Sequence, residues 1–90
     1  MTDKIKFQPG TVVATIGAMD VATSPQIAAL LRRHLSGDWG DVCEQDAKAN
    51  EWALRHGARI LSSYDVDGNK LWVITEASRE STTVLTPGEY

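Results

Sequence analysis

The spacing of apolar residues predicts two helices in the first two thirds of the chain. In the first helix, residues on one stripe recur at intervals of three and four. This stripe consists of Ile27, Leu30, Leu31, His34 and Leu35. Ser24 followed by Pro25 is typical of a helix start, and Gly37 ends the helix. The second helix spans residues 42–56, with Asp41 opening a capping box, and its apolar face is weaker.

Four further segments have the composition or the alternation of strands. Residues 12–16 are rich in β-branched side chains and lie between two glycines, which predicts a first strand. Residues 60–66 alternate with a period of two, and the turn sequence at residues 67–69 follows them. Residues 71–76 are the strongest strand, and residues 82–86 form another one.

These elements predict an α+β fold in the order β-α-α-β-β-β. We expect two helices packed on one face of an antiparallel sheet of three to four strands. Ninety residues supply one hydrophobic core, so residues 1–90 are expected to form a single domain. Within it, residues 1–10 are expected to be a loosely ordered lead-in that ends at a Pro-Gly turn.

Composition and charge narrow the classes of function. Apolar residues make up 42% of the chain and charged residues 23%, as in globular domains. The net charge of −3 argues against binding to a phosphate backbone. Cys43 is the only cysteine, which fits a reducing compartment, and no apolar run resembles a signal peptide or a membrane span. We therefore expect a cytoplasmic protein that does not contact membranes.

The sequence contains no complete motif for binding a metal or a cofactor. The run from Asp65 to Asn69 resembles the start of a calcium loop, but Lys70 occupies the position that requires glycine. A hairpin turn is therefore the better interpretation. A phosphate-binding glycine loop and a set of zinc ligands are also missing from the sequence. We expect neither a metal nor a cofactor.

Polar side chains that flank the predicted antiparallel strands form the main candidate binding site. They are His34, Asp38, Asp41, Asp46, Asn50, Arg59, Thr75, Glu76, Arg79, Thr82 and Thr83. Such groups, once brought together, commonly form a hydrogen-bond network that fixes loops, and this is the first interpretation. The alternative is a site for a small polar ligand or for a loop of a partner. For His34, a hydrogen-bonded and partly buried position is expected rather than a catalytic role.

The three tryptophans suggest where the core and a contact surface lie. Trp72 lies in the strongest strand and is expected in the core. Trp39 lies in a loop between glycines, where it either fills the core or anchors a partner. Trp52 falls opposite the weak apolar face of the second helix, so it is a candidate interface residue.

Two segments carry a resemblance to a known family. Residues 34–41 contain Ser-Gly-Asp-Trp-Gly, and residues 72–87 contain Ile-Thr-Glu-Ala-Ser-Arg-Glu-Ser-Thr-Thr. Together with residues 13–15, 46, 50 and 59–64, they resemble a family of small proteins carried by plasmids, phages and integrated elements. Members are labelled plasmid-related proteins or type I restriction-modification subunits. The resemblance covers nearly the whole chain and implies a mobile-element context, without catalytic residues to carry over.

Three functions follow as hypotheses. The first is a non-enzymatic accessory protein that binds another protein, with a component of host defence or restriction as one target, or that associates with itself as a homodimer. The second is a small enzyme in which His34 and either Asp38 or Asp46 form an acid–base pair. The third and weakest is a nucleic-acid-binding protein that uses a set of arginines. That set consists of Arg32, Arg33, Arg55 and Arg59.

Overall fold

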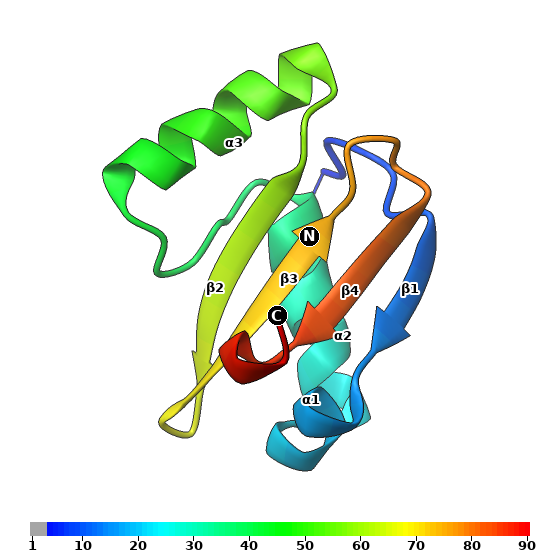
Figure 1. The fold of residues 1–90 in the computed structure, drawn as a ribbon, viewed down its shortest axis with the longest axis vertical. Coiled ribbons are helices and arrows are strands. Elements are labelled where there is room, and N and C mark those ends of the chain that lie inside the picture. The colour runs from blue at the N-terminus through cyan, green and yellow to red at the C-terminus, as the bar shows by residue number, and fades with distance from the viewer. Residues whose placement is uncertain (1–3) are drawn as a thin grey trace.

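The computed structural model describes residues 4–90 of the chain. These residues form β1 (Thr11–Ala14), α1 (Ile16–Val21), α2 (Ser24–Leu35), α3 (Glu44–His56), β2 (Ile60–Val66), β3 (Asn69–Thr75), β4 (Ser81–Leu85) and a final 3-10 turn, η1 (Pro87–Glu89). The helices and the single sheet are seen in Figure 1. The predicted α+β class is confirmed.

The four strands form one sheet in the order β1-β4-β3-β2. Strands β2, β3 and β4 are successive antiparallel neighbours, as predicted for this half of the chain. Strand β1, in contrast, pairs parallel to β4, so the sheet is mixed rather than purely antiparallel. The three helices between β1 and β2 provide the long connection that a parallel pair requires.

Helix α1 was not predicted. The first strand ends at Ala14 instead of Ile16, because the Thr15 hydroxyl accepts a hydrogen bond from the Ala18 N–H (3.1 Å) and caps a helix. Helix α2 likewise begins one residue earlier than predicted, at Ser24, which was the predicted cap. Thr23 is the N-cap, and it forms a capping box with Gln26.

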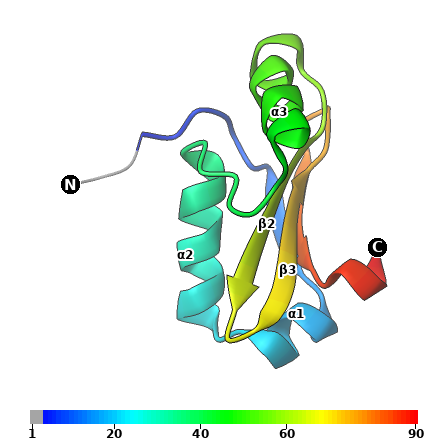
Figure 2. The same ribbon diagram turned by 90° about the vertical axis from the view of Figure 1, so that its left-hand side faces the viewer.

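Helix α2 lies across one face of the sheet, as Figure 2 shows. Its predicted apolar stripe faces the strands, and the largest core cluster lies between them. This cluster of buried side chains comprises Ala18, Ala22, Ile27, Leu30, Tyr64, Val66, Leu71, Val73 and Val84. Strands β2, β3 and β4 therefore supply five of these nine side chains.

Helix α3 also packs with the sheet, but it does not share the face that α2 covers, which corrects the prediction. It lies at the end of the sheet, beside the start of β2 (Figures 1 and 2). A second, smaller apolar cluster around Trp39, Ala53 and Ile60 holds it there. Its N-cap is Cys43, whose Sγ accepts from the Asp46 N–H (3.4 Å), rather than the predicted Asp41.

The lead-in is attached to the core along residues 4–10, and residues 1–3 lie outside the described part of the chain. The Lys6 N–H donates to the Leu35 carbonyl (2.8 Å) at the end of α2. The Phe7 ring packs edge-on against His34, with 5.2 Å between the ring centroids. These contacts bring the N-terminal segment to the same end of the sheet as α3.

Candidate functional site

A chain of hydrogen bonds runs through the core from α2 across the sheet. The fully buried His34 contacts the Ser62 hydroxyl through Nδ1 (2.6 Å) and the Thr75 hydroxyl through Nε2 (2.9 Å). The Thr75 and Thr82 hydroxyls are 2.7 Å apart, and Thr82 donates to the Pro9 carbonyl (2.7 Å). This series of hydrogen bonds ends on the Pro9 carbonyl, which can only accept. Thr82 and Thr75 therefore each donate toward it, and His34 carries its proton on Nε2, which donates to Thr75.

The environment of His34 keeps the imidazole neutral. Burial and, to a smaller extent, the positive charge of Arg79 together lower its pKa from 6.5 to about 4. Both ring nitrogens are used by hydroxyls, and neither contacts a carboxylate. This geometry contradicts the acid–base pair of His34 with Asp38 or Asp46, because a proton relay needs the two groups within hydrogen-bond reach.

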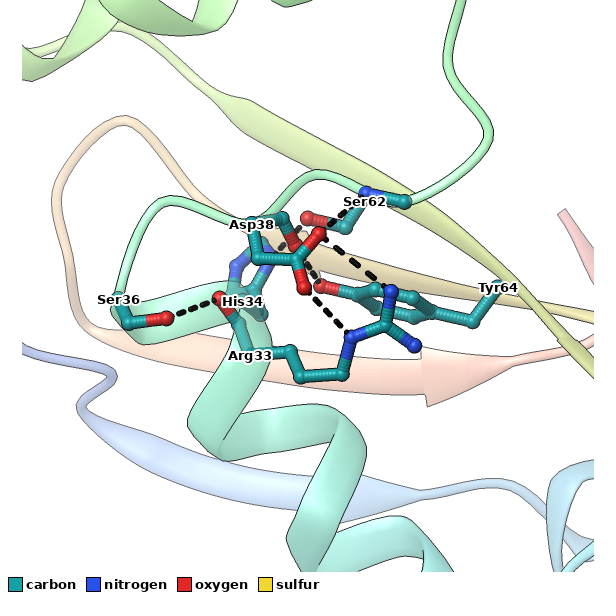
Figure 3. A network of polar contacts seen from close by, with 7 residues as sticks. Arg33, His34, Ser36, Asp38, Ser62 and Tyr64 are labelled. Atoms are coloured by element: carbon teal, nitrogen blue, oxygen red, sulfur yellow. Dashed lines mark hydrogen bonds and ion pairs between the residues drawn. The ribbon is translucent and has the colours of Figure 1, made fainter. Parts of the chain in front are cut away.

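Asp38 belongs to a separate cluster that fastens the loop after α2 to strand β2 (Figure 3). Its carboxylate accepts from Arg33 Nε (2.7 Å) and from the Gly40 N–H (3.2 Å), and the ion pair with Arg33 lowers the pKa of the carboxyl group. The Tyr64 hydroxyl donates to the Asp38 carbonyl (2.6 Å), and Arg33 lies 4.6 Å from the Tyr64 ring centroid. Burial raises the pKa of Tyr64 to about 12, so the phenol remains a donor.

The Ser-Gly-Asp-Trp-Gly segment has a structural role in this loop. Trp39 is buried, and its indole N–H donates to the Glu51 carboxylate on α3 (2.9 Å), so its role is in the core. Gly40 has a φ of +72°, and a Cβ there would lie 2.1 Å from the Ser63 carbonyl oxygen. Only glycine allows the loop to approach β2 so closely.

Asn50 acts as a substitute for a neighbouring strand. Its carboxamide accepts from the Leu61 N–H (3.1 Å) and donates to the Leu61 carbonyl (2.7 Å), which satisfies the outward-facing backbone groups of Leu61 on β2. Two residues further on, the Ser63 N–H donates to the Trp39 carbonyl (3.0 Å), and its carbonyl accepts from the Asp41 N–H (2.6 Å). This edge of the sheet is therefore closed by α3 and the preceding loop.

Arg79 holds the C-terminus of α3 against the turn between β3 and β4. Its guanidinium donates to the carbonyls of Ala53 (3.1 Å), Ala58 (2.6 Å) and Glu76 (3.1 Å). A cation at this position also interacts favourably with the helix dipole. Its backbone φ of +64° is unusual for a residue other than glycine and shapes the turn.

The remaining polar candidates are spread over the surface. Asp46 and Glu76 are exposed, and Asp41 pairs with Lys70 (3.7 Å). Arg59 donates to the Tyr90 hydroxyl and takes no part in the hydrogen bonds of His34. Thr83 lies on the face of the sheet opposite α2, next to Ile74 in the strand register. The candidates therefore do not gather into one site, and only His34, Thr75 and Thr82 share a network.

Two tryptophans remain outside the core described above. Trp72 was predicted in the core, but it is half-buried on the open face of the sheet, where its ring meets Tyr90 edge-on (centroids 5.6 Å apart). Trp52 is exposed, as its helical position predicted. Its ring is stacked on that of His56, with a centroid distance of 4.0 Å and an interplanar angle of 13°.

Two residues that were not predicted from the sequence, Ser62 and Glu89, form important hydrogen bonds. Ser62 alternates with apolar residues on the buried side of β2, and this position was the signal that it had a buried partner. Glu89 accepts hydrogen bonds from Thr15 (2.6 Å), Thr86 (2.9 Å) and the Gly17 N–H (3.1 Å), which lower its pKa to about 2. The spacing of Thr86 and Glu89 matches a capping box and could have indicated this role.

A groove of about 280 Å³ separates α2 from the β2–β3 hairpin. Its charged lining consists of Arg33, Asp65 and Asp67, and the Arg33 guanidinium is already paired with Asp38. Within residues 4–90, histidine, cysteine and carboxylate side chains form no group of three or more that could hold a metal ion. Over the same residues, no helix combines the length and apolar character that crossing a membrane requires.

Comparison of the chain with protein-family models, curated proteins and solved structures finds no match. The resemblance to small plasmid- and phage-borne proteins therefore stays a prediction.

Proposed function

We propose that this protein is a non-enzymatic accessory factor of a mobile genetic element that acts by binding another protein in the cytoplasm. The proposal rests on one observation: a large aromatic side chain, Trp52, is 56% exposed on α3. Burying such a side chain against a partner removes a large apolar area from water, and tryptophan is enriched among residues that dominate binding energy.

The surroundings of Trp52 suit a contact residue. Stacking on His56 and the hydrogen bond from His56 Nδ1 to the Trp52 carbonyl (2.9 Å) restrict both side chains before binding. A side chain that is already ordered loses little conformational entropy in a complex. Lys48 and Arg55 lie one turn before and one turn after Trp52 on the same side of α3. A partner pocket for the indole with a carboxylate on its rim would match this surface.

The polar side chains around α3 support the same proposal, because their hydrogen bonds fix the position of this helix. Asn50 and Arg79 fix α3 to the sheet, and Trp39 fixes it through Glu51. Three side-chain contacts therefore hold helix α3, and Trp52 remains exposed on it. A rigid platform that presents one aromatic side chain is typical of a binding surface.

The test is capture of a partner by the tagged protein, first with a purified type I restriction-modification complex and then with host lysate. Replacing Trp52 with alanine is expected to lower capture by about tenfold or more, since truncation of a central aromatic costs about 2 kcal/mol or more. Replacing Met19, another exposed apolar residue, with alanine is the matched control and is expected to leave capture unchanged. Equal capture by the Trp52 variant, or no specific partner at high bait concentration, would reject the proposal.

A further inference from the structure

The two edges of the sheet differ in how far other segments cover their backbone groups. The outward-facing backbone groups of Leu61 and Ser63 on β2 are satisfied by Asn50 and by the loop at Gly40, as described above. Strand β1 is the other end of the sheet order, and within residues 4–90 no segment pairs with its outer side. An unpaired strand edge is a template for another strand unless charge, proline or a bulge blocks it.

The hydrogen bonds of β1 show which groups point outward. The N–H groups of Thr11 and Thr15 donate to the carbonyls of Glu80 and Val84, both at 2.9 Å, so odd-numbered residues face β4. Because alternate residues of a strand direct their backbone groups to opposite sides, Val12 and Ala14 present theirs to the free edge. Each offers one donor and one acceptor.

The segment that carries this edge has no charged side chain of its own, and the Glu89 carboxylate reaches it from η1, where it binds Thr15 and the Gly17 N–H. Residues 10–19 contain no charged side chain. Within them Val13 is 49% exposed on β1, and Ile16 and Met19, one turn apart on α1, are 74% and 57% exposed. Along β1 no charged side chain or proline blocks the edge, and its length of four residues confines pairing to a short segment.

We propose that the free edge of β1 binds a second copy of this chain, strand to strand and antiparallel, with Val13 on the two-fold axis. Pairing Val12 with Ala14 of the second copy, and the reverse, uses all the outward backbone groups of both strands. Val13 then faces Val13 of the second copy in the closely spaced pair, with about 4.5 Å between Cα atoms. The result is one continuous sheet across two copies.

Charge favours a second copy as the occupant. Each copy has a net charge of −3, so copies repel one another wherever acidic surfaces meet. The side chains of residues 10–19 carry no charge, so pairing this segment across a two-fold axis places no like charges opposite each other on the paired strands. A strand with charged side chains would instead place them against Val13 or Ile16. This interface goes beyond the proposed function, because α3 lies beside β2 at the opposite edge and stays accessible in the dimer (Figure 1).

Sedimentation equilibrium of the full chain over a micromolar to sub-millimolar series tests the pairing. We expect reversible dimers for the wild type. The Val13→Lys variant is expected to weaken dimerisation at least tenfold, because two ammonium groups would face each other across the axis. Trp52→Ala is the control and should dimerise as the wild type does, which separates this result from the test of partner binding.

Disulfide trapping in a Cys43→Ser background tests the register without relying on a destabilising charge. Val13→Cys is expected to form a covalent dimer under mild oxidation. Thr11→Cys should not, since in this register the two copies of residue 11 lie about 14 Å apart along the strands, beyond the reach of a disulfide. A monomer at all concentrations, dimers that Val13→Lys leaves intact, or equal trapping at both positions would overturn the proposal. So would a monomeric wild type whose capture of another protein is lost with Val13→Lys.

Discussion

Acidification should destabilise this protein through a single buried residue, His34. In the unfolded chain its imidazole has a pKa near 6.5, and in the fold burial lowers the pKa to about 4. Because the folded state binds the proton less well, stability is complete above pH 6.5 and is lost as the pH falls toward 4. One pH unit corresponds to about 1.4 kcal/mol, so the loss is about 2 kcal/mol at pH 5 and about 3 kcal/mol at pH 4.

Urea unfolding followed by tryptophan fluorescence measures this loss directly, because Trp39 is buried beside His34 (ring centroids 6.0 Å apart). The matched variant is His34→Gln, whose carboxamide can still reach the Ser62 and Thr75 hydroxyls but does not titrate. The free energy of unfolding of the wild type should fall steeply between pH 6.5 and 4.5, and that of the variant should remain nearly flat.

The carboxyl groups of Glu89 and Asp38 do not account for a loss of stability between pH 6.5 and 4.5. The pKa of Glu89 is lowered from 4.5 to about 2, so its contribution is present above pH 4.5 and is lost only below it. The ion pair with Arg33 lowers the pKa of Asp38 in the same direction. If wild type and His34→Gln had the same dependence on pH between 6.5 and 4.5, the assignment of His34 as a buried neutral residue would be refuted.

Two further substitutions test the closure of the β2 edge, with the free energy of unfolding as the measurement. Asn50→Leu leaves the Leu61 N–H and carbonyl without partners and should cost about 2–4 kcal/mol, whereas a cost below about 0.5 kcal/mol would show that water replaces the carboxamide. Gly40→Ala brings a Cβ to 2.1 Å from the Ser63 carbonyl oxygen and should cost about 3 kcal/mol or more. The control Gly68→Ala has a similar positive φ (+85°) but open space around it, so it should cost only about 1 kcal/mol, and equal costs would contradict the close approach at Gly40.

Regular periodicity made the main elements of this fold predictable. The stripe on α2 and the alternation in β2 depend on residues close together in sequence, and both lie where the pattern placed them. Helix α1 lacked such a signal, because only Ala18 of its residues is buried. Its first turn is instead held by Glu89, which meets Thr15 across 74 positions of the chain.

The candidate site could be predicted only as a set of residues. The sequence indicated that His34 was buried and Trp52 exposed, since both follow from helical position. It could not indicate that Asn50 pairs with β2 or that Arg79 caps α3, because these contacts depend on where α3 docks. Docking in turn depends on tertiary contacts without a periodic pattern, such as the hydrogen bond from Trp39 to Glu51.

The central claim is that buried polar residues build the fold while an exposed aromatic residue carries the function. Partner capture at neutral pH by folded His34→Gln and Trp52→Ala, side by side with the wild type, tests it most directly. We expect His34→Gln to capture the partner as the wild type does, and Trp52→Ala to lose most of the capture at full stability. Loss of capture by a fully folded His34→Gln, together with normal capture by Trp52→Ala, would contradict the claim.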